Sequence, residues 1–243
     1  MHKKERGDNM RVLAIGCHPD DLEIGCGGTL RAYVERGDEV YMCHVANGNR
    51  GHKIIKPDEL RAMRHQEAEN AANKIGATRV YDLDIPDLEV NAADMSQKRK
   101  LIRVIKEVKP DVIITHAPQD YMQDHREVSQ LVFDAEFGAS IDHIEEDLEA
   151  VEIAPLYYMD TLAGIDFNPH EYVDVTDHID TKLDALACHE SQIKWMKEHD
   201  GIDFLDFVKT CAKYRGLQAG VPFAEGFQIC NSWPRAVTKR LLP

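Results

Sequence analysis

One stretch near the amino terminus limits what this chain can fold into more than any other. The apolar run Val12–Ile15 predicts a buried strand, and the apolar spacing over Leu30–Val34 predicts a helix that ends at Gly37. Between them, the segment His18–Asp21 (His-Pro-Asp-Asp) places one imidazole and two carboxylates within four residues. A turn of this kind between a strand and a helix is typical of an α/β unit, where chemistry gathers at the carboxyl end of the strand.

The same turn predicts a metal site. His18 and Asp21 are three residues apart, so one turn of chain can aim both side chains at a single ion. An imidazole together with a carboxylate suits Zn²⁺. Asp20 lies between them and must point elsewhere, close to the ion without binding it. A carboxylate beside a zinc-activated water is the usual general base of hydrolysis, so the turn favours hydrolytic chemistry.

Strands and helices alternate through the first half of the chain. Expected strands, each followed by a helical pattern, cover residues 10–15, 39–45, 79–83 and 111–115. Three successive β-α-β steps predict a mostly parallel sheet in a Rossmann-like three-layer α/β sandwich, with the active site at the carboxyl ends of the strands. After residue 140 the pattern weakens: residues 156–162 and 227–230 indicate strands, and 177–197 and 203–217 indicate helices.

A catalytic zinc site takes three protein ligands and keeps one position open. The third ligand should follow another strand at the same edge of the sheet, and His116 and His125 both qualify. Spacing favours His125 only slightly. Asp124 precedes His125 and is placed to orient it, or another group, from behind.

Charge and composition exclude some partners. The net charge of −14 argues against nucleic acid and anionic membranes, both of which need a basic surface. No apolar run is long enough for membrane insertion. Six scattered cysteines and a charged start with no signal-peptide pattern favour a cytoplasmic protein. We expect a flexible tail over residues 1–9 and a single domain over 10–243.

The glycines of Gly25–Gly28 have two interpretations. Glycines between a strand and a helix can cradle a phosphate, but the G-x-G-x-x-G spacing and the Walker Lys-Ser/Thr are absent. The carboxylates of Asp20 and Asp21 would also repel a phosphate. We therefore expect these glycines to let the helix approach the sheet closely.

Several motifs together resemble one family. His18–Asp21 with Glu23 and Gly25–Thr29 is similar to the signature of the PIG-L (LmbE-like) deacetylases, which are zinc-dependent enzymes that remove N-acetyl groups from N-acetylglucosamine-containing molecules. Further segments resemble other parts of the family pattern: Arg64–Glu67, Pro118–His125, His189–Gln192 and Phe223–Phe227. Together they cover most of the chain, and the first motif is the most specific.

The resemblance implies roles residue by residue. His18, Asp21 and His125 would bind zinc, and Asp20 would be the general base. Arg64 would contact the substrate, Asp87 or less surely Asp84 would bind sugar hydroxyls, and Asp120 is placed with the substrate-binding residues. The resemblance also suggests a homo-oligomer.

One position departs from the family pattern. Many members have His-x-Asp-His in the second motif, where the first histidine polarises the carbonyl or protonates the leaving amine, and here that position is Met122. We take His189 as the candidate replacement and as a second catalytic residue. The other interpretation of His189 is a histidine on a helix surface.

The resemblance and the turn together predict a zinc-dependent hydrolase that removes an N-acetyl group from a GlcNAc-type sugar or glycoconjugate. Two alternatives stay open. One is a zinc-dependent amidase that acts on another N-acylated substrate, such as a sugar–thiol conjugate or an acylated antibiotic. The other is a non-catalytic binding protein stabilised by metal, which would have no need of Asp20.

Overall fold

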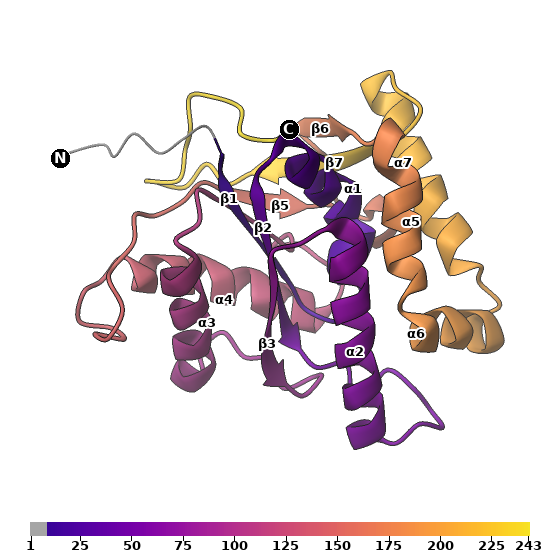
Figure 1. Cartoon of the computed structure of the whole chain (residues 1–243), viewed down its shortest axis with the longest axis horizontal. Coiled ribbons are helices and arrows are strands. Elements are labelled where there is room, and N and C mark those ends of the chain that lie inside the picture. Colours follow the sequence, from indigo (N-terminus) through magenta and orange to yellow (C-terminus); the bar gives the residue numbers. More distant parts are fainter. Residues whose placement is uncertain (1–8) are drawn as a thin grey trace.

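A computed structural model describes residues 9–243. The predicted tail, residues 1–9, falls outside the described residues except for Asn9. Seven strands form one sheet in the order β3-β2-β1-β4-β5-β7-β6 (Figure 1). The strands are β1 (Arg11–Gly16), β2 (Glu39–Ala46), β3 (Arg79–Ile85), β4 (Val112–Thr115), β5 (Leu156–Met159), β6 (Glu171–Asp174) and β7 (Ala224–Ile229). The first five are parallel, and β7 pairs antiparallel with β5 and β6.

Helices cover both faces of the sheet. They are α1 (Asp21–Arg36), α2 (Pro57–Ile75), α3 (Met95–Val108), α4 (Gln123–Ala139), α5 (Ile179–Ala187), α6 (Glu190–Trp195) and α7 (Phe204–Ala219), with short 3-10 or π segments η1 (Leu162–Gly164), η2 (Thr176–His178) and η3 (Met196–Asp200). Figure 1 shows α3 and α4 on one side of the sheet and α1, α2 and α5 on the other. The predicted three-layer, mostly parallel α/β fold is confirmed.

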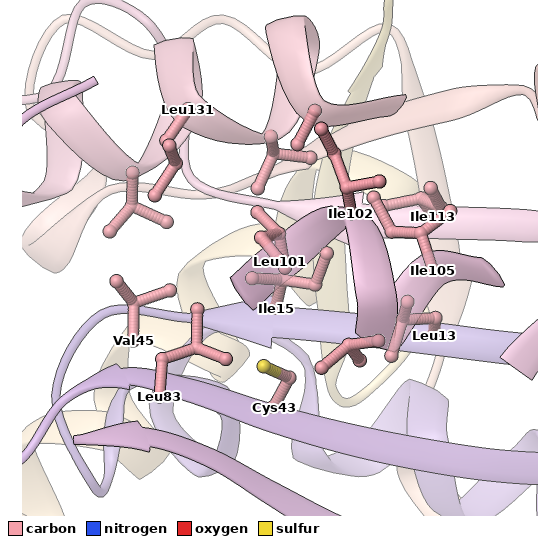
Figure 2. Packing of buried hydrophobic residues seen from close by; sticks show 14 of the residues in the cluster. Leu13, Ile15, Cys43, Val45, Leu83, Leu101, Ile102, Ile105, Ile113 and Leu131 are labelled. Atoms are coloured by element: carbon pink, nitrogen blue, oxygen red, sulfur yellow. The ribbon is translucent and has the colours of Figure 1, made fainter. Parts of the chain in front are cut away.

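Successive side chains of β1 point alternately into two hydrophobic cores, one on each face of the sheet. Leu13 and Ile15 face the layer of α3 and α4, where they pack with Leu101 and Leu131 (Figure 2). Val12 and Ala14 face the opposite layer, against α1 and α2. A strand buried on both faces is apolar throughout, which is why the run Val12–Ile15 marks a central parallel strand.

Several boundaries differ from the sequence expectations. Helix α1 begins at Asp21, so it includes Gly25–Gly28 ahead of the apolar spacing over Leu30–Val34 that predicted a helix. Asp94 caps α3 by accepting from the amides of Ser96 and Gln97. Strand β6 was not anticipated. Within the described residues, no helix has both the length and the apolar character needed to cross a bilayer.

The glycines of α1 serve close packing. A Cβ on Gly28 would lie 2.7 Å from Val175, and one on Gly25 would lie 2.6 Å from the sulfur of Met159. A buried ion pair reaches the backbone there: Lys182 Nζ donates to the Ile24 carbonyl at 2.7 Å, and Glu225 accepts from the Gly28 amide at 2.9 Å. The Glu225 carboxylate accepts from the Gly28 amide, which a bound phosphate would need as a donor. These contacts therefore favour the interpretation that the glycines serve close packing.

A buried lysine organises the loop after α4. Lys106 is 1% exposed, and its ammonium donates to four backbone carbonyls of one loop. Those carbonyls belong to Ile141, Ile144, Glu145 and Leu148. The Lys106 ammonium therefore satisfies carbonyl oxygens that would otherwise need backbone amides or a bound cation.

We predict that Lys106→Met destabilises the protein by about 3 kcal/mol, because it removes the donor of the Ile144 and Leu148 carbonyls and one of two donors of the Ile141 and Glu145 carbonyls. Urea denaturation measures the loss, and limited proteolysis should cut within residues 141–148. Lys100→Met is the matched control on the same helix, since Lys100 is exposed and donates to one carbonyl only. It should cost less than about 1 kcal/mol. Equal losses in the two variants would contradict this account of the loop.

Candidate active site

The turn after β1 is built by short backbone contacts. The Cys17 amide donates to His116 Nε2 at 2.9 Å, which ties the turn to the end of β4. The His18 amide donates to Asp21 Oδ2 at 2.6 Å. Asp20, the residue before α1, has a φ of 121°, an unfavourable backbone conformation for a residue with a side chain. Such strain is typical of functional sites that the surrounding structure holds in place.

Three imidazoles face one carboxylate oxygen. Asp21 Oδ2 lies 3.5 Å from His18 Nδ1, 3.3 Å from His125 Nε2 and 3.3 Å from His116 Nε2. Burial disfavours ionisation of Asp21, but His125 and His116 outweigh it and hold its pKa well below the usual range. The side chains come from the ends of β1 and β4 and the start of α4. The structure thus brings together His18, Asp21 and both candidate histidines.

This spacing fits a metal ion. Two ligand atoms that each lie about 2.0–2.1 Å from a tetrahedral zinc ion are roughly 3.3 Å apart. His18, Asp21 and His125, together with Cys17, form a group whose ligand atoms could hold a metal. Nε2 of His125 is buried without a hydrogen-bond partner among residues 9–243. The cluster is therefore a possible metal-binding site at the predicted edge of the sheet.

His116 and His125 differ in whether Nε2 is already hydrogen-bonded. His116 Nε2 already accepts the Cys17 amide, and burial together with His125 lowers the pKa of His116 to about 4. Burial also opposes the charged form of His125, but Asp21 and Asp120 outweigh it and raise its pKa to about 9. His116 stacks on His125 with ring centroids 4.0 Å apart. These contacts favour His125 as the ligand and His116 as its neutral support.

Two aspartates orient the histidines from behind. Asp124 Oδ2 lies 3.3 Å from His18 Nε2, and Asp120 Oδ2 lies 3.1 Å from His125 Nδ1. Burial opposes ionisation of both acids, but the facing imidazoles outweigh it and lower their pKa values. Carboxylates in this position fix the ring orientation of metal-ligating histidines. Asp124 pairs with His18, and Asp120 pairs with His125 and also lines the cavity, so its predicted contact with substrate stays a prediction.

Asp20 faces the same cavity and has one strong partner. Its Oδ1 lies 3.1 Å from Arg64 Nη2, and Asp20 is 7% exposed. Burial raises the pKa of Asp20 to about 6, although Arg64 acts in the opposite direction. A buried carboxylate with a raised pKa beside a possible metal site is suited to moving a proton.

Arg64 is held by backbone as well as by Asp20. Its guanidinium donates to the Pro19 carbonyl and to the Gly48 carbonyl. Gly48 has a φ of 73°, and a Cβ there would lie 2.6 Å from Arg64 Cδ. Arg64 therefore joins the turn, α2 and the loop after β2.

Asp87 and Asp84 both hold loops. Asp87 accepts from the amides of Gly48 at 2.7 Å and Arg50 at 2.9 Å, and it lines the cavity. Asp84 accepts from Arg61 and Asn47 and does not line the cavity. Of the two acids, Asp87 is the one placed to meet a ligand.

His189 lies outside the cavity wall. His189 and Glu23 are both 0% exposed, with His189 Nε2 3.4 Å from Glu23 Oε2. Burial opposes the charged form of His189, but Glu23 and Asp20 outweigh it and raise its pKa. The histidine belongs to the interior behind Asp20, so the surface interpretation does not hold, and a direct proton-donor role stays a prediction.

The cavity has a volume of about 430 Å³, within the range of small-molecule sites. It is lined by the predicted residues Asp20, Arg64 and Asp87 together with the histidine cluster. Met122 lines it too and directly precedes α4, with its amide donating to Asp120. The sequence analysis did not single out Arg50 or Gln192 as lining residues, although Gln192 ends the family-like segment His189–Gln192.

The fold and the site define a class of protein: an α/β chain with a possible metal centre and an acidic group at the carboxyl edge of a parallel sheet. Residues 13–136 match the PIG-L family, described as GlcNAc-PI de-N-acetylase. This match covers half of the chain, and the chain belongs to the PIG-L family.

Individual relatives match over nearly the full length. Diacetylchitobiose deacetylase of Thermococcus kodakarensis is 26% identical over 235 residues, covering 91% of this chain and 84% of the relative. The structure of N,N′-diacetylchitobiose deacetylase from Pyrococcus horikoshii has a TM-score of 0.79 at 26% identity, covering 92% and 84% of the two chains. The 4-carboxy-2-hydroxymuconate hydratase from Pseudomonas putida has a TM-score of 0.81 at 24% identity, over 95% and 99%, and shows likeness of fold alone.

We predict that Gly48→Ala costs more stability than Gly201→Ala. Both glycines have a φ near 70°, so alanine adds about 1–2 kcal/mol of backbone strain at either site. A Cβ on Gly201 meets nothing within 4 Å, whereas one on Gly48 meets Arg64. We expect a further loss of about 1–3 kcal/mol for Gly48→Ala in urea denaturation. Equal losses would mean that Arg64 moves freely and is not held by this contact.

Proposed function

We propose that this protein is a zinc-dependent amide hydrolase that removes the N-acetyl group from a GlcNAc-type sugar or glycoconjugate. One observation carries the proposal: the carboxylate of Asp20 and the imidazole cluster around Asp21 line the same cavity. The names of the relatives support it, because both chitobiose enzymes are deacetylases. The substrate partner is accordingly a small N-acetyl sugar.

His18, Asp21 and His125 would hold the zinc ion, with Asp124 and Asp120 orienting the two imidazoles. When bound, zinc supplies Lewis-acid polarisation of the amide carbonyl and of water. The ligand set of two imidazoles and one carboxylate matches the metal's preference and leaves one position for substrate.

Asp20 carries the proton chemistry. One proton of the attacking water passes to the Asp20 carboxylate, and the water oxygen bonds to the amide carbon. Asp20 then returns the proton to the nitrogen as the C–N bond breaks, which yields acetate and a free amine. Arg64, 3.1 Å from Asp20, fixes the carboxylate in position and opposes its neutralisation between turnovers.

The remaining site residues surround this centre. Arg64 and Asp87 line the wall that would meet the sugar, while both also hold the turn and the loop after β2. Met122 offers no proton, and His189 is sealed behind the wall. We therefore assign both proton transfers to Asp20, with His189, paired to Glu23, as the alternative proton donor.

We further propose that residues 10–243 act as one deacetylase domain in a cytoplasmic homo-oligomer. The single seven-stranded sheet supports the first point. The six cysteines are all free, as expected in a reducing compartment. Trp233 is 85% exposed and Leu217 is 75% exposed, and both lie outside the cavity, where a second copy could cover them.

We predict that Asp20→Asn lowers acetate release from N,N′-diacetylchitobiose by at least about a hundredfold, because the amide cannot accept the proton. Zinc content measured on the purified variant should stay at the wild-type level. Asp180→Asn, at an exposed acid of α5, is the control and should keep full activity. Wild-type turnover in Asp20→Asn with zinc bound would refute the role of Asp20. Zinc-bound wild-type protein that releases no amine from any N-acyl sugar would refute the proposed hydrolase.

A second prediction concerns the metal. Asp120→Asn should weaken zinc binding by about 10- to 100-fold, since the carboxylate behind His125 would no longer orient the ring. Competition with a chromophoric chelator measures the affinity, and added zinc should restore part of the activity. Unchanged affinity would place Asp120 among the substrate-binding residues, as the resemblance implied.

A further inference from the structure

One hydrophobic cluster of this protein is incompletely buried. The two clusters against the sheet consist mostly of buried residues, whereas a third cluster has only three, Leu186, Phe204 and Val208. Its other members are only partly buried. We refer to this third group as the open cluster. Apolar surface left exposed inside a concave site is a feature of ligand binding.

The open cluster forms part of the cavity wall. Ile24, Leu162, Met196 and Phe204 belong to the cluster and line the cavity that contains Asp20. Ile24 lies on the first turn of α1, and its amide donates to the Asp20 carbonyl at 3.0 Å. The apolar surface therefore begins one helical turn from Asp20. A smaller cavity of about 30 Å³ shares Ile24, Leu162 and Asp160 with the main one, and both apolar and charged side chains line the rest of it.

A polar set of residues lines the rest of the cavity. Arg50, Arg64, Asp87 and Gln192 come from the loop after β2, α2, the loop after β3 and α6. These groups can hydrogen-bond to hydroxyls, and the open cluster cannot. The cavity thus offers both polar and apolar side chains to a bound molecule, and Asp160 lines it beside Leu162 with its carboxylate paired to Arg215.

An N-acyl amino sugar has the same division about its amide. The nitrogen carries a sugar rich in hydroxyls, and the carbonyl carbon carries an alkyl chain. We propose that the open-cluster residues that line the cavity, Ile24, Leu162, Met196 and Phe204, bind the acyl chain of the substrate, and that the enzyme prefers acyl groups longer than acetyl. This inference rests on the proposed hydrolase function and extends it to the acyl specificity of the same site.

The size of the effect follows from burial. Burying one methylene strengthens binding by up to about fourfold. Four additional methylenes, from acetyl to hexanoyl, give a ceiling of roughly two-hundredfold. We therefore expect kcat/KM for N-hexanoylglucosamine to exceed that for N-acetylglucosamine by at least about tenfold.

The test compares N-acetyl-, N-butyryl- and N-hexanoylglucosamine by release of free amine from the zinc-loaded enzyme. A second series compares the methyl and octyl glycosides of N-acetylglucosamine, in which the apolar chain is on the sugar. We expect a gain along the acyl series that exceeds any gain along the glycoside series. A gain confined to the glycosides, or acetyl as the best acyl group, would overturn the inference and leave the hydrolase function standing. No amine from any substrate would overturn the hydrolase function itself.

A matched pair of variants locates the effect. Leu162→Gln changes an open-cluster residue that lines the cavity, and Leu205→Gln changes one of the same cluster that does not. The ratio of kcat/KM for hexanoyl over acetyl should fall at least about threefold in Leu162→Gln and stay at the wild-type value in Leu205→Gln. Calorimetric binding of the two substrates to Asp20→Asn gives the same comparison without turnover. An unchanged ratio in Leu162→Gln would remove the open cluster from acyl binding.

Discussion

A single buried carboxylate oxygen, Oδ2 of Asp21, gathers the site around it. A charge in the interior is costly unless other groups compensate it, and three imidazoles and the His18 amide face this oxygen. Those partners come from separate strand ends, so their convergence requires β1 and β4 to be neighbours in the sheet. The site can therefore form only in a sheet that places β4 beside β1.

Around this centre, most charged side chains already have structural partners. Arg64 holds the strained Asp20, and Asp87 holds the loop after β2, while Asp120 and Asp124 orient histidines. A substrate could form hydrogen bonds only with those donors and acceptors of these groups that are not already paired. Under the proposed function, selectivity would then depend to a large degree on the apolar side chains that line the cavity.

The first half of the chain was predictable because β1 and β4 are almost entirely buried and its helices have one apolar side. The location of the site followed from His18–Asp21 at the end of such a strand. Strand β6 escaped notice because its four residues at a sheet edge, of which only Val173 is buried, have no apolar period. The support of His125 by Asp120, and the seclusion of His189 behind Asp20, depend on contacts between distant segments. Spacing along the sequence contains no information about such contacts.

The ion pair of Lys182 and Glu225 has a consequence for how the chain could be divided. In α1, the Ile24 carbonyl accepts a hydrogen bond from Lys182, and the Gly28 amide donates one to Glu225. The family match ends at residue 136, well before both charged residues. The segment that matches the family is thus not a self-sufficient module. Its first helix is completed by the far end of the chain, so shuffling that segment into another protein would have to bring both charges along.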